Sequence, residues 1–296
     1  MVSFKTIVYG ILLALFAYYV YGPPHKLEPS VFRDRYGPWC VIAGASQGLG
    51  EAFAREIASR GLNVILLARR EKETGEVAER IRRDFNVEAR VVVADLSDGD
   101  SVLQKLEQAS SDVTVGSIIY NAAWSNTGYF LDRTEQELKM AVGVNVQTLT
   151  LLSNRFLKKF KQNKKGGLLI ISSVAGLFGV KHVLAYSSTK AFQIAFARGL
   201  WDEMSEHNVD VVVSVAGGIR TTGLSTVLDA EDYPPGTQTP EEVALESVSF
   251  MSAKGGPVLI PGSLNRLMQS FLQLLPSWAS TKLIGYNLEK RLRKKQ

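Results

Sequence analysis

The stretch Gly44-Ala45-Ser46-Gln47-Gly48-Leu49-Gly50 determines how this chain of 296 residues folds. It follows the apolar run Trp39–Ala43, which is typical of a buried strand, and it opens a helical pattern over residues 48–60. Glycines at such a turn let the backbone approach a pyrophosphate, which the free N–H groups of the helix N-terminus bind. A tight turn alone also uses glycines, but a second strand at the expected distance favours a dinucleotide site formed by residues 44 and 46–50.

Beyond this turn, apolar runs alternate with helical patterns. Most of the runs are continuous Val, Ile and Leu, as expected of strands that are buried on both faces. The alternation predicts an α/β fold with one doubly wound, Rossmann-type parallel sheet of about seven strands over residues 39–262. The expected strands are Trp39–Ala43, Asn63–Ala68, 89–94, 116–120, 167–172, 210–215 and 257–260, and the main expected helices are 48–60, Glu71–Phe85, 134–161, 186–207 and one capped by Thr239.

The second strand ends at two arginines, Arg69 and Arg70. A site for NAD places an acidic residue about 20 residues beyond the glycines, where it binds the ribose hydroxyls. Arg69 stands 19 residues after Gly50, and a guanidinium there can bind a 2′-phosphate bidentately. The pair could instead be solvated arginines at the start of a surface helix. We favour NADP(H) as the cofactor, with Arg69 and Arg70 among its ligands.

A tyrosine and a lysine four residues apart, Tyr186 and Lys190, share one face of the expected helix 186–207. A tyrosine hydroxyl is a poor acid–base group at neutral pH, and a neighbouring ammonium lowers its pKa. Ser173 lies 13 residues before Tyr186, where the fifth strand ends. On its own, a Tyr-Lys pair at this spacing is most often a surface pair of a helix.

In combination, these features resemble the short-chain dehydrogenase/reductase family. Asp95 after the third strand, Asn121-Ala122-Ala123 after the fourth and Asn145 within a helix complete the resemblance, which covers residues 36–261. The N-terminal apolar segment and the Tyr-Gly-Pro-Trp stretch at residues 36–39 are similar to membrane-anchored hydroxysteroid dehydrogenases and 3-oxoacyl-thioester reductases of that family.

The resemblance implies a role for each matching residue. Tyr186 would be the general acid/base and would also contact NADP(H). Lys190 would lower the pKa of Tyr186 and bind the nicotinamide ribose, and Ser173 would hold the substrate oxygen. Asn145 would position a water for proton relay. The further residues expected to contact NADP(H) are Asp95, Leu96, Asn121, Ala122, Gly217, Ile219 and Thr221.

The expected activity is that of an NADP-dependent oxidoreductase that interconverts an alcohol and its ketone or aldehyde. Val174, Leu177, Phe178 and Val180 follow the serine, and Trp124, Tyr129 and Phe130 are candidates for the opposite wall. Such a lining suits a steroid, a retinoid or a long-chain acyl substrate, although these residues could simply pack under the loop at residues 223–239. A catalytically silent NADP-binding scaffold or sensor at a membrane is the alternative, and a soluble enzyme with a small polar substrate is a third reading.

The N-terminal segment is strongly apolar. Residues 1–22 contain one charge, Lys5, and Pro23-Pro24 follows them. The segment is long enough to span a bilayer, so we expect a single-pass membrane anchor followed by a linker at residues 23–38. The bulky Tyr-rich end argues against a cleaved signal peptide. More positive charge follows the segment than precedes it, which favours a cytosolic catalytic domain, at the endoplasmic reticulum if the source is eukaryotic.

The C-terminal residues 263–296 combine an amphipathic helix with a basic tail. Apolar residues from Leu264 to Leu275 recur at helical spacing, and Asn265, Arg266 and Gln269 lie on the opposite face. The apolar face is expected to pack against the body or a partner subunit, or to lie in a membrane interface beside the active site. The family resemblance also suggests a homodimer or homotetramer through the helices 134–161 and 186–207.

Charge and composition exclude several other functions. The net charge is +5, but residues 36–286 hold 25 basic and 26 acidic residues, so no basic face for nucleic acid is expected on the body. One cysteine excludes an internal disulfide, and three scattered histidines without a paired spacing predict no metal site. The expected partners are therefore a lipophilic small-molecule substrate and membrane lipid.

Overall fold

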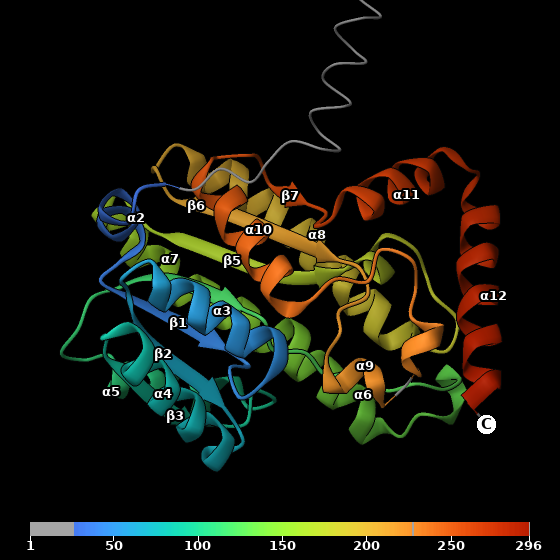
Figure 1. The fold of residues 1–296 in the computed structure, drawn as a ribbon, viewed down its shortest axis with the longest axis horizontal. Helices are drawn as coiled ribbons and strands as arrows, with labels where there is room; N and C mark the ends of the chain where they lie inside the picture. Colours follow the sequence, from blue (N-terminus) through green and yellow to red (C-terminus); the bar gives the residue numbers. More distant parts are fainter. Residues whose placement is uncertain (1–26, 227, 296) are drawn as a thin grey trace, which may run out of the picture.

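The computed structural model of the chain describes residues 27–226 and 228–295, and for residues 293–295 only the backbone. Its centre is one parallel sheet of seven strands in the order β3-β2-β1-β4-β5-β6-β7, which confirms the predicted sheet (Figure 1). The strand order reverses between β1 and β4, where a ligand crevice forms at the carboxyl ends of the strands. The strands are β1 (Trp39–Ala43), β2 (Asn63–Ala68), β3 (Ala89–Val93), β4 (Val115–Tyr120), β5 (Gly167–Ser173), β6 (Asp210–Ala216) and β7 (Val258–Leu259).

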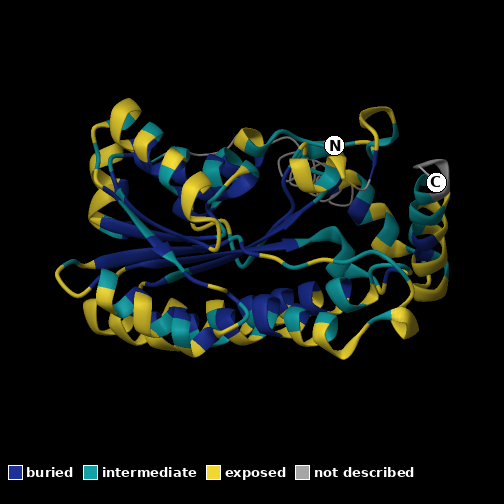
Figure 2. Ribbon diagram, turned by 90° about the horizontal axis from the view of Figure 1, so that it is seen from below, coloured by how far each residue is buried: buried dark blue, intermediate teal, exposed yellow. Residues whose placement is uncertain are grey.

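Helices cover both faces of the sheet, and Figure 2 shows the buried strands between two helical layers. One core joins the sheet to α5 (Gly99–Ala109), α7 (Thr148–Asn163) and α8 (Leu184–Ser205). The other joins it to α2 (Pro29–Tyr36), α3 (Gly48–Ser59), α4 (Glu71–Phe85) and α10 (Pro240–Ser252). Because both faces are covered, the central strands are apolar along their whole length, which is why they could be predicted from the sequence.

The region expected as a linker, residues 23–38, is partly helical. Helix α2 occupies it from Pro29, and Phe32 and Tyr36 are completely buried. The Tyr36 hydroxyl donates a hydrogen bond of 2.7 Å to Asp210 Oδ2 at the start of β6. The expectation of a linker is therefore corrected for α2, whose aromatic residues belong to the second core.

The predicted anchor, residues 1–22, lies outside the described residues. Within residues 27–226 and 228–295, no helix has the length and apolar character needed to cross a membrane.

The expected long helix over residues 134–161 is interrupted. Helix α6 (Glu135–Val142) and α7 are joined by a π-helical turn, η2 (Gly143–Gln147). A wider turn of this kind inserts a residue into the helix and often marks a functional position. The turn carries Asn145, whose side chain is completely buried and bonded to the loop after β4.

The C-terminus forms two helices, α11 (Ser263–Leu274) and α12 (Ser277–Lys295), which lie at one end of the molecule in Figure 1. The amphipathic helix is confirmed, but its polar face is the buried one, because Asn265, Arg266 and Gln269 are at most 6% exposed. The Arg266 side chain forms an ion pair with Glu246 of α10 and donates to the carbonyl of Ile260. Of the placements left open for the apolar face, packing against the body does not apply to Leu264, Leu267, Phe271 and Leu274, which are 42–84% exposed.

Candidate active site

The glycine turn lies at the carboxyl end of β1, beside the residues that follow β4. Gly44 has a φ of +84°, and a Cβ there would be 2.8 Å from the Cα of Ala122. A Cβ on Gly50 would be 1.9 Å from the carbonyl oxygen of Gly44, which accepts a hydrogen bond of 3.0 Å from Asn121 Nδ2. No other residue type fits these two positions, so the turn keeps its backbone groups accessible to a pyrophosphate.

The two arginines after β2 reach the same turn. Arg70 donates to the Ser46 hydroxyl at 2.8 Å and to Gln47 Oε1 at 2.9 Å. Arg69 lies 4.0 Å from Asp95, and both side chains are about half exposed. The structure thus brings together two cations and the start of α3, a set of groups that fits a dinucleotide with a 2′-phosphate.

The other expected cofactor residues divide into two groups. Leu49 and Leu96 are buried in the two cores, so their side chains serve packing. Gly217, Ile219 and Thr221, which follow β6, line the pocket described below. The Thr221 methyl group would lie 3.3 Å from a Cβ on Gly48, which places it beside the glycine turn.

The serine, tyrosine and lysine meet at the carboxyl end of β5. Ser173 is the last residue of β5, while Tyr186 and Lys190 come from the first turns of α8. Burial raises the pKa of the Tyr186 hydroxyl, and a hydrogen bond with the Ser173 side chain acts in the opposite direction. Ser173 and Tyr186 therefore form one hydroxyl pair at the edge of the sheet.

Lys190 is only 2% exposed. Its ammonium donates to the Ile171 carbonyl at 2.6 Å and to Gln193 Oε1 at 3.0 Å, and it lies 5.5 Å from the centre of the Tyr186 ring. Desolvation lowers its pKa to about 7. Burial is the largest cause of both pKa shifts, and the expectation that Lys190 lowers the pKa of Tyr186 stays a prediction.

Gln193 is a site residue that the sequence analysis missed. It is completely buried, accepts from Lys190 and donates from Nε2 to the Asn145 carbonyl at 2.9 Å. The Asn145 side chain accepts a hydrogen bond of 2.8 Å from the Trp124 backbone N–H and donates one of 2.9 Å to the Trp124 carbonyl. It also donates to the Thr189 hydroxyl at 2.9 Å. A continuous chain of hydrogen bonds thus runs from Lys190 through Gln193 to the backbone of Asn145. A polar residue three positions after Lys190 on a helix face was the signal available in the sequence.

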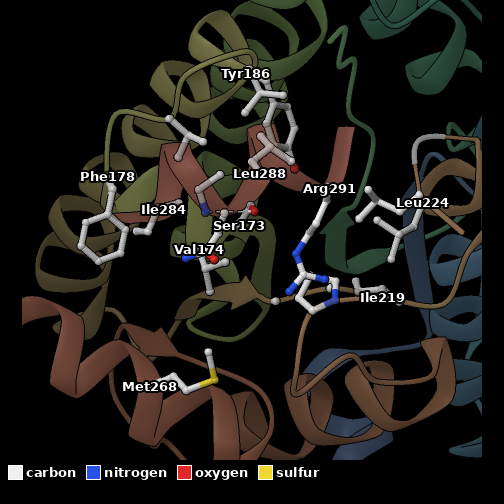
Figure 3. Close-up of a pocket in the computed structure, with 18 of the residues that line it drawn as sticks. Ser173, Val174, Phe178, Tyr186, Ile219, Leu224, Met268, Ile284, Leu288 and Arg291 are labelled. Atoms are coloured by element: carbon white, nitrogen blue, oxygen red, sulfur yellow. Dashed lines mark hydrogen bonds between the residues drawn. The ribbon is translucent and has the colours of Figure 1, made fainter. Parts of the chain in front are cut away.

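A cavity of about 740 Å³ opens in front of Ser173 and Tyr186, within the usual range for small-molecule sites (Figure 3). Val174, Phe178 and Val180 line it, as the sequence predicted, and so do Leu224 and Leu228 of the loop after β6. Leu177 and Trp124 pack against the first core instead, and Tyr129 and Phe130 are about half exposed outside the lining. The cavity wall is mainly apolar.

Comparison with known proteins settles the family. The family model described as short chain dehydrogenase matches residues 38–232. The chain belongs to the short-chain dehydrogenase family. This short-chain dehydrogenase is similar to a solved structure of a 7beta-hydroxysteroid dehydrogenase, with a TM-score of 0.78 and 26% identity over 86% of this chain and 99% of that one.

Two curated relatives differ in what their names report. The very-long-chain 3-oxoacyl-CoA reductase of Mus musculus is 28% identical over 84% of this chain and 79% of its own length. The inactive hydroxysteroid dehydrogenase-like protein 1 of Homo sapiens is 33% identical over 60% of this chain and 54% of its own length. Similarity of this order places the fold and leaves the activity to be argued from the site.

Part of the pocket lies beyond the region that the family model matches. Met268, Phe271 and Leu272 of α11 and Leu283, Ile284 and Leu288 of α12 line it, and Figure 3 shows several of these side chains around the same space as Ser173 and Tyr186. The apolar face of α11 is therefore divided between the cavity and the exterior. In this short-chain dehydrogenase, the two C-terminal helices complete the wall of the pocket.

Proposed function

We propose that this short-chain dehydrogenase interconverts a lipophilic alcohol and its ketone or aldehyde with NADP(H). The observation that carries the proposal is the position of the Ser173–Tyr186 hydroxyl pair in the lining of a large, mainly apolar cavity. An apolar lining with a few convergent polar groups suits a substrate of steroid or long-chain acyl type. The relatives named for hydroxysteroids and 3-oxoacyl-CoA support both substrate classes.

NADP(H) supplies the hydride when bound, and the chain supplies binding and orientation. The glycine turn and the N-terminus of α3 would hold the pyrophosphate, and Arg69 and Arg70 the 2′-phosphate. Asp95, Asn121 and Ala122 border the adenosine side of this crevice. The absence of a carboxylate immediately after β2 supports NADP(H) over NAD(H).

Tyr186 is the proton donor in the direction of reduction. Its hydroxyl adjoins the Ser173 hydroxyl, which would hold the substrate oxygen and keep it within reach of the proton. Lys190 is anchored behind the tyrosine by the Ile171 carbonyl and Gln193. Asn145 fixes the loop after β4 and, through its carbonyl and Gln193, the position of Lys190. All four groups are present, which favours an enzyme over a silent scaffold.

We further propose that the enzyme works at a membrane as a single-pass protein with a cytosolic catalytic domain. The apolar residues 1–22 and the charge after them support this location. Exposed Phe192 and Trp201 on α8 and Val142 on α6 support association of copies through these helices. The expected partners are thus membrane lipid and a second copy of the chain.

The test is a panel of lipophilic ketones assayed with NADPH and NADH in parallel, followed by Tyr186→Phe. The variant should lower kcat with NADPH by about a thousandfold or more, because it removes only the proton donor. NADPH binding, measured by fluorescence, should stay unchanged.

Tyr129→Phe is the matched control, because it removes a hydroxyl from an exposed tyrosine outside the pocket lining. Its kcat should equal that of the wild type. Undiminished turnover by Tyr186→Phe would refute the assigned role. A wild type that binds NADPH but reduces no ketone would favour the scaffold reading.

A further inference from the structure

The apolar cavity contains one charged side chain. Of the described residues that line it, Arg291 of α12 alone carries a charge. Figure 3 shows its guanidinium in the same space as Ser173, Ile219 and Leu224. A cation held in an apolar wall costs solvation unless it is paired, so its partner is informative.

The pairing of Arg291 is incomplete. Its guanidinium donates to the backbone carbonyl of Asp232, and a guanidinium has five N–H donors. No carboxylate in the described part of the chain forms an ion pair with it. The contrast with Arg266 on α11 is direct, since Arg266 has the Glu246 carboxylate as its partner. Arg291 is thus positioned as a donor towards the cavity.

A second polar side chain of the wall, Gln269, has one atom without a hydrogen-bond partner. Gln269 of α11 is 6% exposed, lines the cavity, and its Oε1 is buried without a hydrogen bond. The segment at residues 232–236 contacts both C-terminal helices. The Asp232 carbonyl accepts a hydrogen bond from Arg291 of α12. The Gly236 carbonyl accepts a hydrogen bond of 2.9 Å from Asn265, which lies one helical turn before Gln269 on α11. Two side chains of the C-terminal helices, Arg291 and Gln269, therefore offer unused hydrogen-bonding groups to a ligand in a mainly apolar wall.

We propose that Arg291 binds an anionic group carried by the lipophilic substrate, at a position separate from the carbonyl that meets Ser173 and Tyr186, with Gln269 as a further hydrogen-bonding contact. This inference rests on the proposed function and narrows its substrate class to lipophilic anions. A carboxylate matches the planar fork of a guanidinium bidentately, and phosphate oxygens do so as well. The apolar body of the substrate then lies between the two polar ends.

The experiment compares matched substrates in wild type and Arg291→Gln, with the full chain and NADPH. The first pair is an oxocholanoic acid and its methyl ester, which differ in one charge. We expect Arg291→Gln to raise KM for the acid by about tenfold or more and to leave KM for the ester within about twofold. Arg291→Lys should restore part of the affinity for the acid, because it keeps the charge without the fork.

Lys290→Gln is the matched control, because it removes the same charge from the neighbouring exposed residue, outside the lining. It should leave both KM values unchanged, which separates a local contact from the general field of the basic tail. An equal rise in KM for acid and ester would overturn the proposal and indicate damage to α12. No change in KM for the acid, the ester or a long-chain 3-oxoacyl-CoA would overturn it as well.

A second pair identifies the source of the anion. A long-chain 3-oxoacyl-CoA carries phosphates, and its N-acetylcysteamine thioester lacks them. Dependence on Arg291 for the CoA thioester alone, with none for the oxocholanoic acid, would assign the contact to phosphate. Dependence for the acid assigns it to carboxylate.

Binding separates this inference from the proposed function. Tryptophan fluorescence measures the affinity of the oxocholanoic acid for the NADP⁺ complex without turnover. Binding that is weakened about tenfold by Arg291→Gln, with no reduction by the wild type, would support the anion site and refute the oxidoreductase. Turnover of the acid, the ester and the 3-oxoacyl-CoA, with no effect of Arg291→Gln on any of them, would support the oxidoreductase and refute the anion site.

Discussion

At the residue scale, Lys190 shows how burial changes a familiar side chain. A lysine on a helix surface is charged at every physiological pH, but desolvation lowers the pKa of this one to about 7. The Ile171 carbonyl and Gln193 both accept from it, so its ammonium is satisfied but separated from any carboxylate. Lys190 can consequently gain or lose a proton near neutrality, which suits the acid–base role proposed for Tyr186.

This pKa predicts a stability that depends on pH. The pKa of Lys190 is about 7 in the folded chain and 10.5 for an ordinary lysine, so between these values the unfolded chain binds a proton that the folded chain does not. The free energy of unfolding of the cofactor-free wild type should therefore rise with pH relative to Lys190→Met, by at most about 1.4 kcal/mol per pH unit. Urea denaturation at several pH values between about 7 and 10 measures the difference.

The exposed Lys282 on α12 provides the control. The free energy of unfolding of Lys282→Met should change with pH in parallel with that of the wild type. If the curves of wild type and Lys190→Met are also parallel across this range, the lowered pKa of Lys190 is wrong.

At the element scale, α11 shows what a periodic pattern can and cannot determine. The spacing of leucines from Leu264 to Leu275 identifies which residues share a face, but both faces of a helix can be buried if the polar one finds partners. Here Asn265 donates to the carbonyls of Gly236 and Pro261, and Arg266 meets Glu246. Gly236 and Glu246 lie 29 and 20 residues before their partners, so the orientation of the helix could not be read from its own sequence.

The ion pair predicts how firmly α11 is attached. Arg266→Met should lower the free energy of unfolding by about 3 kcal/mol, because it leaves the largely buried Glu246 carboxylate without its partner. The side chains of Arg266 and Glu246 are 8% and 18% exposed. Urea denaturation measures the change.

The pair Arg55–Asp84 is the comparison, since its side chains are 40% and 26% exposed and solvent screens them. Arg55→Met should cost less than about 1 kcal/mol. Equal losses for the two variants would contradict the idea that the pair fixes α11.

The other elements also differ in whether their sequence signal is local or depends on tertiary contacts. Strand β1 and the capping box of α10, with Thr239 and Glu242, were predictable because the signal is local. The π turn at Asn145 was not, because the amide bonds to the backbone of Trp124 that widen it are tertiary. Ser173, Tyr186 and Lys190 were identified as candidates through the family resemblance, whereas the contacts of Gln193 required the assembled fold.

At the scale of the whole molecule, exposed apolar side chains gather at one end. Leu264, Leu267, Phe271 and Leu274 of α11 are 42–84% exposed, and so are Trp278, Leu283 and Tyr286 of α12. A patch of this kind on a soluble surface marks an interaction site. It adjoins the cavity, and Lys282 and Lys290 lie on the same helix α12 as its aromatic residues. Tryptophan, tyrosine and lysine together favour contact with a lipid surface, from which a lipophilic substrate can enter.

This contact predicts that Trp278, at 68% exposure, meets acyl chains when the full protein is reconstituted in anionic vesicles. Lipids brominated on their acyl chains should quench tryptophan fluorescence, and Trp278→Phe should remove roughly half or more of that quenching, because aromatic residues of an interfacial helix reach the acyl boundary. Trp201 of α8 is 38% exposed on another helix, so Trp201→Phe should leave the quenching intact. The N-terminal segment contains no tryptophan, so an anchor alone cannot produce this signal. Quenching that survives Trp278→Phe unchanged would place α12 away from the bilayer and assign the apolar end to a protein partner instead.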